Sequence, residues 1–142
     1  MAAALDLSSN QRVFIVDDDL DTLTVMSVLF ESLGANVTLC SESTDAARTY
    51  GLNTRADKPF DLIVLDIRMP RMNGYELAAE LKAQGHKGMI VAFTANVTGR
   101  GRRVSKEGSF DYYFSKGTFD KNLAKALLGQ CKDFTEGKIV DF

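Results

Sequence analysis

The chain has 142 residues, of which 45% are hydrophobic and 25% are charged, and its net charge is −2. This length predicts one domain with a sizeable apolar core, and this balance excludes a disordered chain and an integral membrane protein. No apolar run approaches the roughly 20 residues that span a bilayer, and residues 1–10 lack the pattern of a secretory signal. We therefore expect a cytoplasmic protein that binds neither a membrane nor, directly, nucleic acid.

In the first half of the chain, short apolar runs alternate with helical patterns. Residues 13–16 and 62–65 are uninterrupted apolar runs rich in β-branched side chains, which is typical of strands covered on both faces of a parallel sheet. Between these runs we expect a helix, an edge strand and a short helix, at 22–33, 36–40 and 45–50.

The second half continues the alternation. A helix is predicted at 75–83, ended by Gly85, and a last helix at 119–128. Two further strands are predicted at 89–93 and 112–114. Five strands that alternate with helices predict a doubly wound α/β fold with helices on both faces of a parallel sheet.

The segment between Thr94 and Phe110 interrupts this pattern. Each of its glycines lowers helix propensity by about 1 kcal/mol relative to alanine. We expect a short or frayed fourth helix here, and we interpret the arginines of 99–103 as a solvated loop, with a partner-docking patch as the alternative.

Polar residues follow the predicted strands at the point where each strand ends. Asp17 and Asp18 follow the first, Asp66 the third, Thr94 the fourth, and Ser115 with Lys116 the fifth. Ligands of open parallel sheets bind outside the carboxyl ends of the strands, so we expect these residues to converge on one crevice.

The charges in that crevice predict a magnesium site. Two unit charges about 4 Å apart interact by roughly 4 kcal/mol at an effective dielectric of 20, so three carboxylates repel strongly unless cations intervene. Lys116 supplies one positive charge, and an oxygen ligand set without His or Cys suits Mg²⁺ rather than zinc. Such a site is suited to phosphoryl transfer, with Asp66 as the nucleophile and Asp17 and Asp18 as metal ligands.

Four motifs in this order resemble the response-regulator receiver family, which is CheY-like. They are Phe14-Ile-Val-Asp-Asp18, the run from Leu62 to Gly74 that contains Asp66-Ile-Arg-Met-Pro70, the step Phe93-Thr-Ala95, and Lys116. The resemblance covers about residues 11–130, so residues 1–10 are expected to be an N-terminal extension and 131–142 a tail of unassigned structure. It implies a flavodoxin-like sheet of five strands in the order 2-1-3-4-5.

The resemblance also implies a role for each site residue. Asp17 and Asp18 would be the acidic pair, Asp66 the phosphoacceptor, Thr94 the switch hydroxyl and Lys116 the phosphate-binding lysine. Arg68 would offer its backbone carbonyl to Mg²⁺. Tyr113 matches the aromatic position whose ring turns inward once Thr94 moves towards the phosphoryl group, with a half-buried strand residue as the alternative.

By the same resemblance, the chain would be a two-component phosphorelay protein. Its phosphodonor would be a histidine kinase or a histidine phosphotransfer protein, and a downstream protein would bind the surface made by the fourth helix, the fifth strand and the fifth helix. It would catalyse its own phosphorylation and slow dephosphorylation without dedicated substrate turnover. A stand-alone regulator and a receiver from a hybrid histidine kinase or multidomain regulator both fit.

The chain departs from the family after Lys116. The family usually has a proline there, joined by a cis peptide, whereas this chain has Gly117. A cis bond before a residue other than proline costs roughly 2.5 to 4 kcal/mol, so we expect a trans peptide.

Three other functions remain as alternatives. An aspartyl-phosphate phosphohydrolase needs a second acid two residues after the nucleophile, where this chain has Arg68. A flavodoxin-like FMN binder needs a hydroxyl- and glycine-rich loop after the first strand, where three aspartates would repel the flavin phosphate. A receiver-like interaction module that is never phosphorylated is the third.

Five other residues have simpler interpretations. Asp19 is expected to cap the first helix, together with Asp21 in its first turn. His86 follows Gly85 and is expected to be a surface loop residue. Cys40 and Cys131 match no metal-ligand spacing, and we expect reduced, partly buried thiols, with a disulfide as the alternative.

Overall fold

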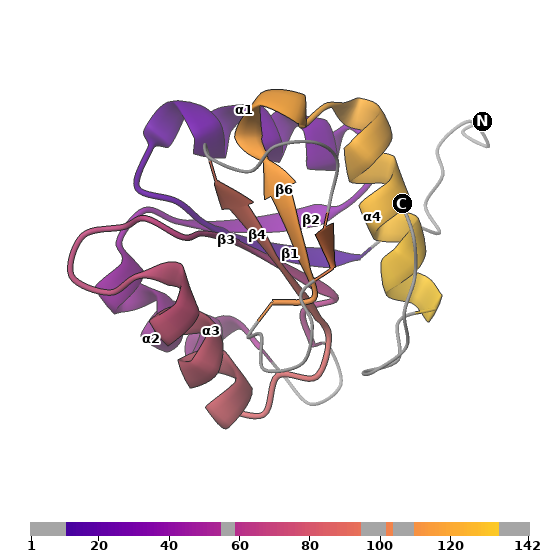
Figure 1. The fold of residues 1–142 in the computed structure, drawn as a ribbon. Helices are drawn as coiled ribbons and strands as arrows, with labels where there is room; N and C mark the ends of the chain where they lie inside the picture. The colour runs from indigo at the N-terminus through magenta and orange to yellow at the C-terminus, as the bar shows by residue number, and fades with distance from the viewer. Residues whose placement is uncertain (1–10, 55–58, 95–101, 104–109, 134–142) are drawn as a thin grey trace.

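The structure is a computed structural model that describes residues 11–54, 59–94, 102–103 and 110–133. Strands and helices alternate along the chain from Arg12 to Thr94, and two further strands follow before the last helix (Figure 1). The strands are β1 (Arg12–Val16), β2 (Asn36–Cys40), β3 (Leu62–Asp66), β4 (Met89–Thr94), β5 (Arg102–Arg103) and β6 (Tyr112–Ser115). The helices are α1 (Leu20–Glu31), α2 (Ser43–Asn53), α3 (Gly74–Ala83) and α4 (Lys121–Asp133), with a short 3₁₀ turn, η3 (Lys116–Thr118).

The strands form one sheet in the order β2-β1-β3-β4-β6-β5. The first five strands in this order are parallel, and β5 pairs antiparallel with β6 at the edge. Because β6 is the fifth strand predicted from the sequence, the expected parallel order 2-1-3-4-5 is confirmed, with β2 at one edge. In this register Val16 of β1 lies opposite Leu65 of β3, so the two strands end side by side.

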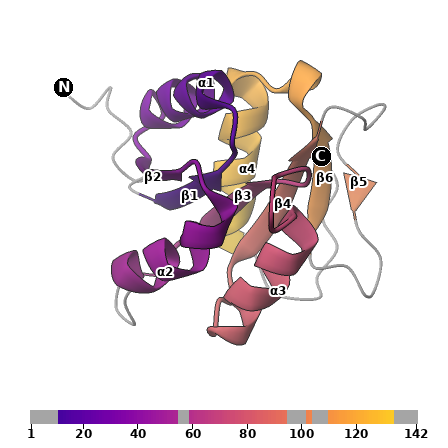
Figure 2. The ribbon, with the colours of Figure 1, turned by 90° about the vertical axis from the view of Figure 1, so that its left-hand side faces the viewer.

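Helices cover both faces of the sheet, and each face has its own apolar core. Helices α1 and α4 cover one face, and α2 and α3 cover the other (Figures 1 and 2). Successive residues of β1 alternate between the cores: Val13 and Ile15 contribute to the first, Phe14 and Val16 to the second. A strand buried on both faces explains why the run carries no polar alternation.

The structure corrects one predicted element and extends others. Where the structure describes the segment predicted as a short or frayed fourth helix, at Arg102 and Arg103, the chain forms strand β5. This pairing satisfies backbone N–H and C=O groups at the open edge of β6. No sequence pattern revealed that this edge was available for pairing. The rest of 95–109 lies outside the described residues. Helix α2 runs from Ser43 to Asn53, longer than predicted, and α4 continues through Asp133 into the predicted tail.

His86 is not the surface residue that its sequence context suggested. It is only 7% exposed, its Nδ1 lies 3.2 Å from the Tyr50 hydroxyl, and its ring meets the Tyr50 ring edge-on. Burial, with a further contribution from the charge of Lys82, lowers the pKa of His86 to about 4. The left-handed Gly85 turns the chain so that the next side chain points inward. The imidazole is therefore neutral at pH 7.

Other local predictions are confirmed. The Asp19 carboxylate caps α1 by accepting from the backbone N–H of Asp21. Cys40 and Cys131 are free and partly buried. Among the residues that the structure describes, no helix is long and apolar enough to span a bilayer.

Gly74 is required where the loop after β3 enters α3. A Cβ atom at this position would lie against the backbone oxygen of Asp66 and 3.0 Å from the Cα of Ile67. Both neighbours are backbone, which cannot give way as a flexible side chain can. The Asn73 side chain and the Glu76 side chain form a capping box around this first turn.

We predict that Gly74→Ala destabilises the fold by about 1 to 3 kcal/mol, the usual cost of overpacking, and shifts the backbone of Asp66. Gly129→Ala is the matched control, because Gly129 lies in α4 with nothing within 4 Å of an added Cβ. That substitution should stabilise by about 0.5 to 1 kcal/mol through helix propensity. Urea unfolding of both variants and the parent measures the two effects, and equal effects of the two alanines would contradict the prediction.

A second prediction concerns pH. Because the pKa of His86 is lower in the folded chain than its ordinary value of 6.5, the unfolded chain binds more protons between about pH 4 and 6.5. Stability contributed by neutral His86 is thus complete above pH 6.5 and is lost as the pH falls towards 4, by about 3 kcal/mol in total. His86→Gln cannot titrate, so its free energy of unfolding should fall less than that of the parent across this window. Parallel curves for the two proteins would contradict the assignment.

Candidate functional site

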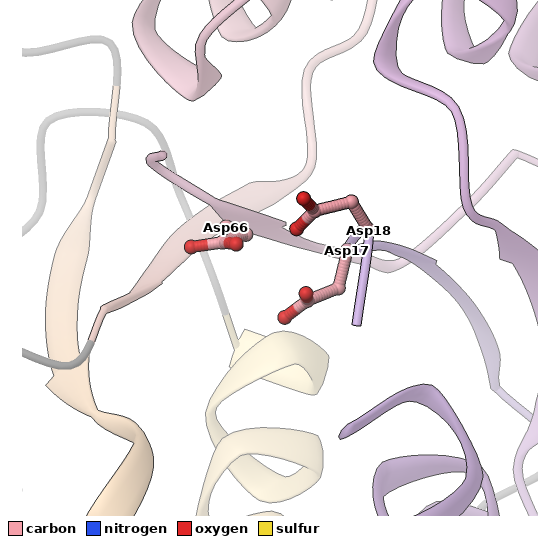
Figure 3. Close-up of side chains that lie close together, drawn as sticks. All are labelled: Asp17, Asp18 and Asp66. Carbon is pink, nitrogen blue, oxygen red and sulfur yellow. The ribbon is translucent and has the colours of Figure 1, made fainter. Parts of the chain in front are cut away.

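Three aspartates from two neighbouring strands meet at one edge of the sheet (Figure 3). Asp17 directly follows β1, and Asp66 is the last residue of β3, so the register that pairs Val16 with Leu65 brings both carboxylates together. One carboxylate oxygen from each of Asp17, Asp18 and Asp66 lies within 4.8 Å of the others. Asp17 and Asp66 are buried, whereas Asp18 is exposed. The convergence predicted from the strand ends is present.

Lys116 joins the two buried carboxylates. Its Nζ lies 2.9 Å from Oδ2 of Asp17 and 3.3 Å from Oδ2 of Asp66. It follows the last residue of β6 and begins η3, where the Ser115 hydroxyl accepts from the Gly117 N–H at 3.2 Å. The described residues include no cis peptide, so the expected trans Lys116–Gly117 bond is confirmed. A hydroxyl-capped turn therefore places this lysine.

Burial sets the protonation of the site. Burial and then the negative charge of Asp17 raise the pKa of Asp66, Lys116 opposes both, and the net result is a pKa of about 6. Burial on its own would lower the pKa of Lys116, but its hydrogen bond to Asp17 and the charges of Asp17 and Asp66 raise it. At pH 7 the lysine is cationic and most Asp66 side chains are ionised.

The donor set fits a hard divalent cation. All three side chains offer carboxylate oxygens, and no His or Cys joins the cluster among the described residues. The backbone orients two of these carboxylates: Oδ1 of Asp17 accepts from the Asp19 N–H at 2.9 Å, and Oδ1 of Asp66 accepts from the Arg68 N–H at 3.3 Å. This second bond holds the backbone of Arg68 beside Asp66, and Arg68 is the residue whose carbonyl the family resemblance implies as a metal ligand.

Asp18 opens onto a groove of about 330 Å³. The start of α1, the loop before α2 and the loop before α3 form its walls through Leu20, Glu42, Pro70 and Arg71. The site is therefore buried on the sheet side and accessible from this groove.

The other predicted site residues occupy two neighbouring strands. Thr94, the last residue of β4, is buried and lies opposite Ser115 in register, one residue beyond the partner of Asp66. Tyr113 lies in β6 and is half-buried, and its hydroxyl is bonded to that of Tyr75 in α3. The sequence prediction missed Tyr75. Its position directly after Gly74 was visible, but its contact across the fold was not.

Comparison with known protein families matches residues 13–128 to the response regulator receiver domain. The sensor histidine kinase GacS of Pseudomonas protegens is 32% identical over 82% of this chain and 13% of its own length. The transcriptional regulatory protein ZraR of Salmonella typhimurium is 32% identical over 81% of this chain and 26% of its own length. The chain thus spans about an eighth to a quarter of these relatives.

Solved structures agree. The receiver domain of the sensor histidine kinase PA1611 from Pseudomonas aeruginosa, with a magnesium ion coordinated in its active site cleft, is 26% identical and has a TM-score of 0.71. The alignment covers 88% of this chain and 99% of that one. A response regulator receiver domain protein from Clostridium thermocellum, 22% identical with a TM-score of 0.68 over 87% of this chain and 95% of that one, shares the fold. On its sequence match and its sheet, this chain belongs to the response regulator receiver domain family of two-component signalling.

Proposed function

We propose that this domain accepts a phosphoryl group on Asp66 in a magnesium-dependent reaction and thereby switches a protein-binding surface. The observation that carries this proposal is the joint position of three carboxylates and one ammonium group at the carboxyl edge of the sheet. Three carboxylates that lie this close together repel one another and destabilise the fold. A cluster with this cost is therefore a candidate functional site rather than an ordinary structural ion pair.

Each group has a task in that reaction. The Asp66 carboxylate attacks phosphorus, an O–P bond forms, and the bond from phosphorus to the donor nitrogen breaks. Asp17, Asp18, Asp66 and the Arg68 carbonyl would hold Mg²⁺, which would neutralise charge on the phosphoryl oxygens. Lys116 already contacts Asp66 and can pair with a phosphoryl oxygen. Positioning and charge neutralisation supply most of the catalysis of phosphoryl transfer.

The switch would use Thr94 and Tyr113. Phosphorylation adds about 1.5 to 2 negative charges and three strong acceptor oxygens next to the buried end of β4. The Thr94 hydroxyl can donate to one of these oxygens, and its movement would make room for the Tyr113 ring. The surface around β6 and α4 would then change shape, and a downstream protein would bind it.

The phosphodonor would be a histidine kinase or a histidine phosphotransfer protein. The relatives support this class, since one is itself a sensor histidine kinase and another a transcriptional regulatory protein. A stand-alone regulator and a receiver within a longer protein both fit the matches. Cytoplasmic location follows from a donor of this class, and fractionation of cells would test it.

The first test is modification of Asp66. With acetyl phosphate and Mg²⁺, the intact protein should gain the mass of one phosphoryl group, and chelation of Mg²⁺ should abolish the gain. Asp66→Asn should take up none. The matched control is Asp45→Asn, which removes an exposed carboxylate from the first turn of α2 and should behave as the parent. Equal uptake by Asp66→Asn and the parent would overturn the proposal.

A second prediction follows from the raised pKa of Asp66. Since the folded chain binds more protons than the unfolded chain between the ordinary pKa of 3.8 and about 6, the ionised carboxylate lowers stability as the pH rises through this window. Asp66→Asn should therefore raise the free energy of unfolding at pH 7 by about 1 to 3 kcal/mol, and this gain should vanish below pH 4. Urea unfolding in metal-free buffer measures it.

A third prediction concerns the effect of Mg²⁺ on the stability of the parent and of Asp66→Asn. A ligand that binds only the folded chain stabilises it by about 2.7 kcal/mol at a hundredfold excess over its Kd. The parent should gain thermal stability with Mg²⁺, and Asp66→Asn should gain less because one ligand has lost its charge. A metal response that is the same in both proteins would show that Asp66 takes no part in binding.

A further inference from the structure

Three aromatic side chains from separate segments form a cluster beside the site. Tyr75 comes from the first turn of α3, Tyr113 from β6 and Phe110 from the residues just before β6. The ring centroids of Tyr75 and Tyr113 are 6.4 Å apart, and each ring also meets Phe110 edge-on, at 5.3 and 5.7 Å. The two tyrosine hydroxyls are hydrogen-bonded to each other at 2.5 Å.

The two hydroxyls come from elements that border the proposed phosphorylation site, because α3 begins beside Asp66 and β6 ends just before Lys116. Tyr75 follows Gly74, whose Cα approaches the Asp66 backbone too closely to carry a side chain. The Gly74 N–H also donates to the Ile67 carbonyl at 2.9 Å. Tyr113 lies three residues before Lys116, which contacts Asp66 itself. The hydroxyl pair therefore connects the loop after β3 with the end of β6.

We propose that Tyr75 is a positioning residue that holds Tyr113 in its resting orientation through this hydroxyl bond, and so opposes the switch. The inference rests on the proposed function. Tyr75 stands in the first turn of α3, so a Tyr113 ring that turned away from this helix would lose the bond. The Tyr75 side chain is 42% exposed and is not one of the buried core residues, so packing in the core does not account for it.

The protonation behaviour of Tyr113 agrees with this geometry. Burial and then the hydrogen bond with Tyr75 raise the pKa of Tyr113 to about 12. The Tyr113 hydroxyl thus keeps its proton at neutral pH. Either hydroxyl of the pair can be the donor. Hydrogen bonds between uncharged groups make modest net contributions to the stability of a conformation.

Coupling between sites is reciprocal. If the bond stabilises the resting state, it lowers the affinity of the domain for any ligand that favours the switched state. Loss of the bond must then raise the affinity for that ligand. From the usual worth of one neutral hydrogen bond, the expected change in affinity is about two- to tenfold. Loss of the hydroxyl should therefore activate the domain.

The experiment measures the affinity of the full chain for beryllium fluoride, a phosphoryl mimic, in saturating Mg²⁺. Tyr75→Phe should bind it about two- to tenfold more tightly than the parent. In a Tyr113→Phe background, where the bond is already absent, Tyr75→Phe should have no further effect. Tyr50→Phe is the control, since it removes a tyrosine hydroxyl that pairs with His86 in the core, and it should bind as the parent does.

Tyrosine ¹³Cδ NMR reports the orientation of the ring through the neighbouring rings, and this carbon is remote from the hydroxyl whose bond is removed. Tyr75→Phe should shift the Tyr113 resonance in the ligand-free protein towards its position in the beryllium fluoride complex. Unchanged affinity in Tyr75→Phe, or the same tightening in the Tyr113→Phe background, would overturn the inference while leaving the phosphorylation of Asp66 in place. A parent that binds no beryllium fluoride would instead overturn the proposed function, and the inference with it.

Discussion

The contact of the Lys116 ammonium with Asp17 and Asp66 is the interaction on which the site depends. Two buried carboxylates side by side repel each other, and desolvation adds to the cost. One cation at 2.9 and 3.3 Å offsets this repulsion without removing it, since the pKa of Asp66 still rises to about 6. Residual negative charge of this kind attracts a second cation. This residual charge is the basis of the proposed magnesium site.

The parallel sheet makes that contact possible. In parallel strands all carboxyl ends reach the same edge, so residues from β1, β3 and β6 meet although about 100 residues of sequence separate Asp17 from Lys116. The helices fill both faces with apolar side chains, which leaves only the loops at the edge to hold polar chemistry. Gly74 lets the helix after β3 begin directly against the backbone of Asp66.

The sequence predicted the parts of this arrangement that depend on local pattern. Strand β2 has its predicted bounds, and the acidic cluster follows from where the apolar runs stop. The misses come from contacts across the fold. His86 is buried because Tyr50, 36 residues away, provides a partner, and Arg102 and Arg103 form a strand because β6 offers an unpaired edge. Tyr75 resembles any exposed helix residue until Tyr113 is placed beside it. The structure brings the predicted acids and Lys116 together, but the role of every site residue stays a prediction.

The short strand β5 has a consequence for how the molecule behaves in crowded solution. An open edge of a sheet presents unpaired N–H and C=O groups that can template pairing with another chain. Here β5 pairs with Tyr112 and Tyr113, the first two residues of β6, on the side of β6 that faces away from β4. Two residues of antiparallel chain are too short to propagate a sheet. Among the described residues the strand order therefore ends at β5, and intermolecular strand addition is disfavoured at the side where Tyr113 lies.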